Sequence, residues 1–246
     1  MLRNISSMRH YNLMAKDGEI GKCRDFLFDD DQWAIRYMVA DTARWLPGRK
    51  VLISPLSLGA PQWPDQLLPV DLTKEEIKES PLLEEDAPVS RQYEMRWADH
   101  YHYPYYWPHG DLWGIRNYAP AAPPKRQKPE SAEDPQGSNL RSIKEVTGYR
   151  IDASDGDIGH VEDFIIDDTM WSIRYLVVDT RNWLPGRKVL IAPIWVDHIR
   201  WADESVHVNM NKERIEQSPR YDPKQPVNLG YEARLYDYYG RPVAKP

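Results

Sequence analysis

Three histidines lie in one aromatic stretch of the chain, between Arg96 and Trp113. Neutral imidazole is a common metal ligand, so His100, His102 and His109 are the candidates for a metal site. No cysteine or carboxylate accompanies them at a spacing typical of zinc sites. We therefore expect no metal and no cofactor. The alternative is an aromatic arm that packs on a β-barrel or on a second subunit.

Acidic turns and the single cysteine suggest no further chemistry. Asp29 to Asp31 and Asp152 to Asp157 lack the ligand spacing of an EF-hand, which favours solvated turns over a calcium site. Cys23 is replaced by valine at the matching place of the repeat described below, as expected for a small buried side chain. The chain has no glycine-rich phosphate loop, nucleophile elbow, H-E-x-x-H or C-x-x-C motif. We expect a protein that is not an enzyme.

Two arginines stand among apolar residues in the middle of predicted strands. A buried arginine requires a partner of opposite charge. We expect structural ion pairs between Arg36 and Asp41 and between Arg174 and Asp179.

Tryptophan and tyrosine supply most of the aromatic residues, since the chain has 10 Trp, 15 Tyr and only 3 Phe. Both types suit surfaces that are partly apolar and partly wet, and tryptophan is frequent at binding hot spots. The alternative for the tryptophans that precede Leu-Pro-Gly is the closure of a barrel corner. The predicted interaction surface consists of Trp45, Trp183, Trp97, Tyr105, Tyr106 and Trp107.

These residues are carried by a sequence that occurs twice, at an offset of 138 positions. From Gly18 to Leu56, 24 of 39 positions are identical in the second copy. Such a long repeat indicates two copies of one module. We predict a first module with its arm over residues 1–118, a proline-rich linker over 119–138 and a second module with its arm over 139–246.

Each module is predicted to be mainly β. From Trp33 to Ala40, β-branched and aromatic residues alternate in the manner of a strand, and apolar residues on both faces suggest a curled sheet. Thr73 and Glu76 have the spacing of a capping box at the start of a short helix. We predict two tandem small β-barrels, each followed by a short helix and an aromatic-rich extended arm.

The repeated segment resembles the PRC-barrel family. The residues that carry this resemblance are D-D-x-x-W-x-I-R-Y-x-V-x-D-T-x-x-W-L-P-G-R-K-V-L-I, and it covers Tyr11 to Glu79 and Tyr149 to Gln217. It implies a barrel of five or six strands that binds other proteins. The namesake is the cytoplasmic domain of the photosynthetic reaction centre H subunit, which helps electron and proton transfer to the quinone. A related barrel in a ribosome maturation factor binds a ribosomal protein.

The composition narrows the class of partner. Lys and Arg number 32 against 38 Asp and Glu, which gives a net charge of −6, and neither half is basic. We therefore expect no nucleic acid and no polybasic contact with lipid. No apolar segment is long enough to span a bilayer. The expected location is the cytoplasm, with the inner face of a bacterial membrane as a peripheral alternative.

We thus expect a non-catalytic module that binds another protein, with a photosynthetic or membrane-associated complex as the candidate partner. The aromatic arms are expected to join copies of the chain into a homo-oligomer. The alternatives are an H-subunit-like auxiliary in photosynthetic electron transfer, or a stress protein that binds a small molecule or metal.

Overall fold

The computed structural model describes residues 1–42, 45–47, 49–82, 89–107, 139–180 and 186–240. The chain divides into two compact units. Unit 1 consists of Met1–Ser7 and Ile143–Pro246, and unit 2 of Met8–Ser142. The first strand of each repeat therefore belongs to the unit of the other repeat. The linker predicted over 119–138 lies outside the described residues.

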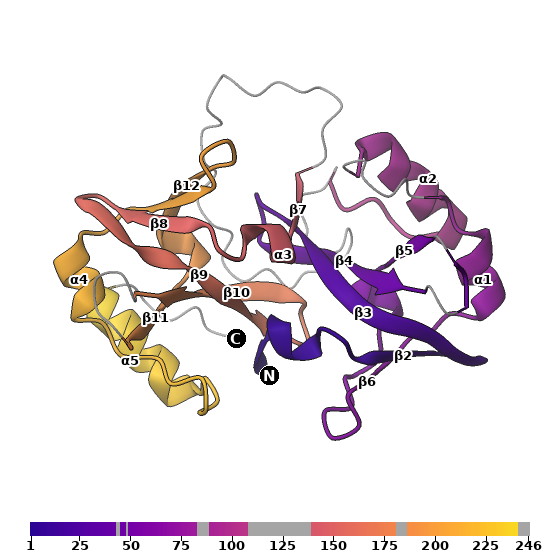
Figure 1. Cartoon of the computed structure of the whole chain (residues 1–246), viewed down its shortest axis with the longest axis horizontal. Coiled ribbons are helices and arrows are strands. Elements are labelled where there is room, and N and C mark those ends of the chain that lie inside the picture. Colours follow the sequence, from indigo (N-terminus) through magenta and orange to yellow (C-terminus); the bar gives the residue numbers. More distant parts are fainter. Residues whose placement is uncertain (43–44, 48, 83–88, 108–138, 181–185, 241–246) are drawn as a thin grey trace. The chain divides into compact units, whose positions relative to one another are not determined.

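Unit 2 is a mixed β-sheet with two helices (Figure 1). Its strands pair in the order β5-β4-β3-β2-β6, and β7 also pairs with β3. Among its described strands, only β2 and β6 run parallel. The strands are β2 (Asn12–Ala15), β3 (Gly18–Asp29), β4 (Ala34–Asp41), β5 (Lys50–Ile53), β6 (Leu67–Pro69) and β7 (Leu140–Ser142), and the helices are α1 (Lys74–Glu79) and α2 (Arg91–Tyr101).

Unit 1 repeats this plan with one more strand. Its order is β12-β13-β8-β9-β10-β11, and β1 also pairs with β9. The strands are β1 (Leu2–Asn4), β8 (Arg150–Ala153), β9 (Gly156–Asp167), β10 (Ser172–Asp179), β11 (Lys188–Ile191), β12 (Val196–Arg200) and β13 (Ser205–Val208), and the helices are α3 (Ile143–Val146), α4 (Lys212–Glu216) and α5 (Leu229–Tyr239). Short 3-10 helices are η1 (Ile5–Met8), η2 (Pro55–Ser57) and η3 (Pro193–Trp195).

The prediction of a mainly β chain is confirmed, but the structure does not show two closed barrels. In the described part of unit 2, no ladder joins β6 to β5, so the sheet remains open. One isolated bridge, between Leu58 and Val70, links the segments that follow these strands.

Strand β4 has the two-sided burial that its sequence predicts. Every residue from Ala34 to Ala40 is buried. The neighbouring β3 stays close to it through Gly21, which has a φ of +128°. A Cβ at this position would lie 2.0 Å from the carbonyl oxygen of Asp41, so only glycine fits here. Gly159 repeats this geometry opposite Asp179 in unit 1.

The predicted capping box of α1 is confirmed. The Thr73 side chain accepts a bond from the backbone N–H of Glu76, whose carboxylate accepts one from the N–H of Thr73. The prediction of an extended arm directly after this helix was wrong, because residues 91–101 form the second helix α2. Ser90 caps α2, and its buried residues recur at helical spacing: Tyr93, Glu94, Trp97 and Ala98.

We keep the name aromatic arm for residues 102–107, which follow α2. In unit 1, Asn228 caps the corresponding helix α5.

No described helix combines the length and apolar character needed to cross a bilayer.

Helix α2 covers the face of unit 2 formed by β4 and β5 (Figure 1). The Trp97 ring packs edge-on against the Tyr37 ring, with 4.9 Å between the ring centroids. The Trp97 Nε1 donates a hydrogen bond to the carbonyl of Leu52 at 3.0 Å. At the offset of 138, leucine replaces Trp97 in α5, while Trp195 replaces Ser57 in η3. Each unit thus buries one indole near this helix, supplied by a different element.

The two repeats exchange their first strands. In unit 1, β1 pairs with the end of β9, from Leu2 opposite Asp167 to Asn4 opposite Ile165. In unit 2, β7 pairs with the equivalent end of β3, from Leu140 opposite Asp29. The short strand that pairs with the end of each long strand is therefore supplied by the other repeat.

A buried aspartate on the long strand receives each exchanged segment. Asp163 accepts bonds from the Asn4 side chain at 2.9 Å, from the backbone N–H of Ser6 at 3.2 Å and from the Ser6 hydroxyl. Asp25, the equivalent residue of unit 2, accepts a bond from the Ser142 hydroxyl. The same contact thus occurs twice.

Asp30 gives the exchanged strand of unit 2 a pH dependence. Its carboxylate lies 3.4 Å from Arg141 on β7, and burial raises its pKa from 3.8 to about 6. The folded state thus holds this proton more firmly than the unfolded state. The stability that it contributes is complete below about pH 4 and is lost as the pH rises through about 6.

The measured quantity is the free energy of unfolding of the natural chain minus that of Asp30→Asn. We expect this difference to fall by on the order of 2 kcal/mol between pH 4 and pH 7. Denaturant titrations of both chains across this range measure it. A difference that stays constant or rises with pH contradicts the assignment.

Candidate functional site

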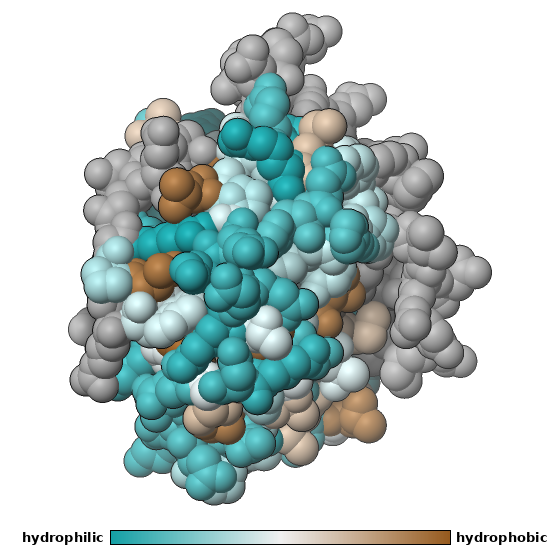
Figure 2. All heavy atoms as spheres, turned by 90° about the vertical axis from the view of Figure 1, so that its right-hand side faces the viewer, coloured by the Kyte–Doolittle hydropathy of each residue, from teal (hydrophilic) through white to brown (hydrophobic). Residues whose placement is uncertain are grey.

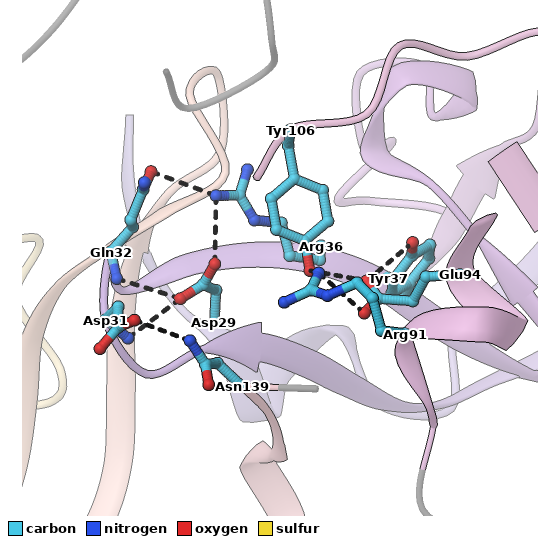
Figure 3. Close-up of polar contacts among 9 residues, drawn as sticks. All are labelled: Asp29, Asp31, Gln32, Arg36, Tyr37, Arg91, Glu94, Tyr106 and Asn139. Atoms are coloured by element: carbon cyan, nitrogen blue, oxygen red, sulfur yellow. Dashed lines mark hydrogen bonds and ion pairs between the residues drawn. The ribbon is translucent and has the colours of Figure 1, made fainter. Parts of the chain in front are cut away.

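A network of charged and phenolic side chains lies in unit 2 where α2 meets β4 (Figure 3). Glu94 is its centre, and none of its surface is exposed. Its Oε2 accepts bonds from the hydroxyls of Tyr37 at 3.2 Å and Tyr106 at 2.6 Å. Arg91, one turn earlier on α2, donates to its Oε1 at 3.1 Å. These three donors compensate the burial of the carboxylate.

Arg36 on β4 forms the second half of the network. Its Nη2 lies 3.4 Å from the Asp29 carboxylate and donates to the Gln32 side chain at 3.2 Å. Its guanidinium carbon lies 3.8 Å from the centre of the Tyr106 ring, a cation–π distance. Tyr106 thus contacts Glu94 with its hydroxyl and Arg36 with its face (Figure 3).

The prediction of a buried ion pair for Arg36 identified the wrong carboxylate. The pair is with Asp29 at the end of β3, whereas Asp41 lies 3.9 Å from Arg24. Residues separated by five positions on a strand point to opposite faces, so Arg36 and Asp41 diverge. A bulge between Leu27 and Phe28 shifts the register of β3 next to Asp29.

Burial keeps the phenols of the network neutral. It raises the pKa of Tyr37 and of Tyr106, and the adjacent Glu94 carboxylate raises both further. Burial also lowers the pKa of Arg36, which the charge of Asp29 opposes. At neutral pH the two tyrosines are therefore hydrogen-bond donors, and neither supplies a phenolate nucleophile.

The space beside the network is small. Trp97, Tyr103, Tyr106 and their neighbours line a cavity of about 20 Å³. This volume suits a single water molecule, and sites for small organic ligands are at least ten times larger. The geometry therefore favours a role in holding α2 and the aromatic arm on the sheet.

Unit 1 contains a reduced version of the network. Glu232 on α5 accepts a bond from the Tyr175 hydroxyl at 2.7 Å, and Arg174 lies 3.6 Å from it. The expected pairing of Arg174 with Asp179 was therefore also wrong, for the same reason of strand geometry. The position equivalent to Tyr106 lies outside the described residues.

Arg174→Met is expected to lower the free energy of unfolding by about 1 kcal/mol or less, because a partly exposed ion pair contributes little. The Arg174 side chain is 22% exposed, and Glu232 keeps its bond from Tyr175. Chemical denaturation of the variant and the natural chain measures the difference. A loss above about 3 kcal/mol would show that this pair behaves as a buried one.

The structure separates the aromatic residues of the predicted interaction surface. Trp97 and Tyr106 are buried and make the contacts within unit 2 described above, so they are not surface residues. Tyr105 and Trp107 are half-buried and stack with ring centroids 4.9 Å apart. Trp45 is half-buried, with Lys74 5.8 Å from its ring, and Trp183 lies outside the described residues.

The sequence around Trp45 that recurs in the second repeat has a structural use in both units. The buried Thr42 hydroxyl donates to the carbonyl of Arg49 at 2.8 Å, and Thr180 makes the same bond to Arg187 at 2.9 Å. Arg49 in turn donates to the carbonyl of Ser80 at the end of α1. This motif therefore ties the strand corner to the following helix.

The histidines do not form a metal site in the described part of the chain. His100 bonds to the carbonyl of Glu76 at 3.1 Å, and the exposed His102 ends α2 with a φ of +56°. His109 lies outside the described residues. Within the described ranges, no group of three or more His, Cys, Asp or Glu could hold a metal ion.

Glu94 and Asp29 were not predicted as site residues. The sequence nevertheless holds a signal for Glu94, because the pair Tyr93-Glu94 recurs without change as Tyr231-Glu232. An acidic residue retained in both copies beside apolar helix positions indicates a buried carboxylate. Asp29 is likewise retained in the second copy, as Asp167, but it stands in a run of three aspartates that resembles a solvated turn, so the sequence does not indicate its burial.

Comparisons with known proteins add no assignment to this geometry. No protein-family model matches the chain, and no curated protein matches it either.

Proposed function

We propose that the chain is a non-catalytic protein-binding module of the PRC-barrel type, built from two related β units. The use of the shared polar residues supports this proposal. Glu94, Tyr37 and Arg36 bond to one another or to neighbouring elements, and the cavity beside them is too small for a substrate. The six described strands of unit 2 fall within the five or six that the family resemblance implies.

The candidate docking surface is the outer edge of the aromatic arm in unit 2. Trp107 stacks on Tyr105 and lies 4.3 Å from the guanidinium of Arg91. Leu56, which is 48% exposed, and Pro104 lie beside them. Tryptophan, tyrosine and arginine are the residue types that dominate binding hot spots. The contacts of Arg91 with Glu94 and Trp107 fix this surface before any partner binds, which lowers the entropic cost of association.

A small, aromatic-centred contact suits the rest of the surface. Figure 2 shows that the side of the molecule carrying α1 and α2 is mainly hydrophilic, with hydrophobic residues in small groups. A large obligate interface would require a broad apolar patch. We therefore propose a partner protein that buries the Tyr105–Trp107 pair and places a carboxylate near Arg91.

The test is affinity capture from an extract of the source cells, with the natural chain, Trp107→Ala and a control. The control is Met95→Ala, which removes a side chain that is 41% exposed on α2 and lies outside the proposed surface. We expect the natural chain and Met95→Ala to capture the same protein and Trp107→Ala to capture less than about one tenth as much, as for a hot-spot residue. Equal capture by Trp107→Ala would overturn the proposed surface.

Light scattering of the same three proteins tests the expected homo-oligomer. If a second copy is the partner, the natural chain and Met95→Ala share a multiple of the 28.8 kDa monomer mass and Trp107→Ala returns to the monomer. A monomeric natural chain excludes this form of the proposal.

A further inference from the structure

Unit 1 contains a concave site that the proposed function does not use. Its volume is about 670 Å³, within the range of sites for small organic ligands. The loop between α4 and α5 forms one wall, and the start of β11 and the first turns of α5 form the others. The residues that bear on its chemistry are Lys188, Arg220, Tyr221, Lys224, Tyr231 and Arg234.

The site is basic in a chain whose net charge is −6. Four of its lining residues are cationic, and Asp222 is the one carboxylate among them. Lys188 is paired with Glu162, and Arg220 donates to the carbonyl of Gly186 at 2.8 Å. Within the described ranges, neither Lys224 nor Arg234 forms an ion pair with a carboxylate. A concave surface with unneutralised cations attracts anions.

Asp222 lowers the net positive charge of the lining but does not cancel it, and its carboxylate accepts hydrogen bonds within its own turn. Its Oδ1 accepts the backbone N–H of Lys224 at 3.0 Å, and its Oδ2 accepts the side-chain amide of Gln225 at 3.2 Å. The turn therefore fixes the Lys224 backbone, and the Lys224 ammonium group takes no part in these two hydrogen bonds.

Two tyrosines make a firm wall for the site. The Tyr221 hydroxyl donates to Asn4 at 2.9 Å, and that of Tyr231 donates to the carbonyl of Pro219 at 3.0 Å. Their ring centroids lie 6.5 Å apart. Because both hydroxyls are bonded within the unit, the rings offer an apolar surface, and Arg234 lies 5.9 Å from the Tyr231 ring.

The internal repeat shows that the fold does not require this charge. At the offset of 138, Lys188, Tyr231 and Arg234 have identical counterparts in the first repeat. Arg220 and Lys224, however, correspond to Leu82 and Asp86. The framework is common to both repeats, whereas the two loop cations occur in the second repeat alone.

We propose that this concave site of unit 1 binds a small organic anion that carries at least two acidic groups, as carboxylates or phosphates. Arg220 and Lys224 on the loop and Arg234 on α5 contact the acidic groups, and the tyrosine rings contact the apolar part. The volume admits a molecule of metabolite size. The tyrosine wall suits an anion with an apolar skeleton, and the spread of cations over a loop and a helix requires more than one acidic group.

Calorimetric titration of the full chain with citrate and, separately, with pyrophosphate tests the proposal at low ionic strength. We expect at least one probe to bind with one-to-one stoichiometry. The double variant Arg220→Leu with Lys224→Asp gives the site the residues of the first repeat. It is expected to weaken binding at least about tenfold, because it removes two charge-assisted contacts. Citrate binding alone indicates a carboxylate ligand, and pyrophosphate binding alone a phosphate ligand.

The matched control is Arg200→Leu with Lys144→Asp, which changes the charge of unit 1 equally at two exposed residues outside the site. We expect it to bind the probe within about twofold of the natural chain, since distant exposed charges are screened. Lys224→Gln, a milder change, repeats the test if the double variant does not fold. Absence of binding by both probes, or equal weakening in the control, would overturn the proposal.

Discussion

Glu94→Ala is expected to lower the free energy of unfolding of unit 2 by about 4 kcal/mol, because it removes the shared acceptor of a buried network. The hydroxyls of Tyr37 and Tyr106 lose their partner inside the protein, and Arg91 loses its ion pair. The alanine side chain also leaves an unfilled space. Glu94→Gln keeps the volume and one acceptor, so we expect about half of this loss.

The single cysteine of the chain allows unit 2 to be measured by itself. Cys23 is fully buried in β3, and burial raises the pKa of its thiol, so a thiol reagent reacts only when unit 2 opens. We expect Glu94→Ala to increase the labelling rate by at least about a hundredfold at low denaturant, as its destabilisation requires. Asp99→Asn is the control, because Asp99 is an exposed acid on the same helix whose carboxylate accepts a bond from Tyr105 and takes no part in the network around Glu94. Labelling of Glu94→Ala at the rate of the control would contradict the proposed role of the network.

Asp163→Ala is expected to release the first strand from unit 1 and to destabilise this unit by about 3 kcal/mol. The variant loses the bonds from Asn4 and Ser6 and the bond from the backbone N–H of Phe164 at 2.8 Å. A strand of three residues has few other contacts with which to hold its register.

Hydrogen exchange separates this effect from general unfolding. We expect the amides of Leu2–Asn4 and of their partners Ile165–Asp167 to lose protection in Asp163→Ala. The labelling rate of Cys23 should stay within about twofold, because the thiol lies in unit 2. Asp25→Ala is the converse variant, and it should expose Leu140–Ser142 and accelerate the labelling of Cys23. Equal labelling in the two variants would mean that the units open together.

Much of each unit could be predicted from the sequence because its signals are local. The alternation from Trp33 to Ala40 and the capping box at Thr73 each depend on residues within one element. The repeat then extended the strand prediction to the second copy, whereas Asn211 and Arg214 replace the two capping-box residues there. The mainly β character and the position of the first helix are confirmed for this reason.

The errors concern features that depend on distant residues or on weak propensities. Helix α2 is rich in tyrosine and tryptophan, which have modest helix propensity, so its composition predicts an extended arm and hides the helical spacing of its buried residues. The partner of Arg36 depends on the register of two strands, and the partner of Arg174 lies on a helix 58 positions further along the sequence. No local sequence pattern encodes either pairing. The exchange of β1 and β7 rests on segments too short to show a period.

The exchange of β1 and β7 between the repeats has a consequence for folding during synthesis. Unit 2 acquires its last strand only when residues 140–142 leave the ribosome, and β1 has no partner until β9 follows. At ordinary rates of translation, the delay between the synthesis of β1 and that of β9 lasts roughly 8–30 s. During that time the nascent chain presents open strand edges, which are sites for chaperones or for mispairing with a neighbouring copy on the same messenger RNA.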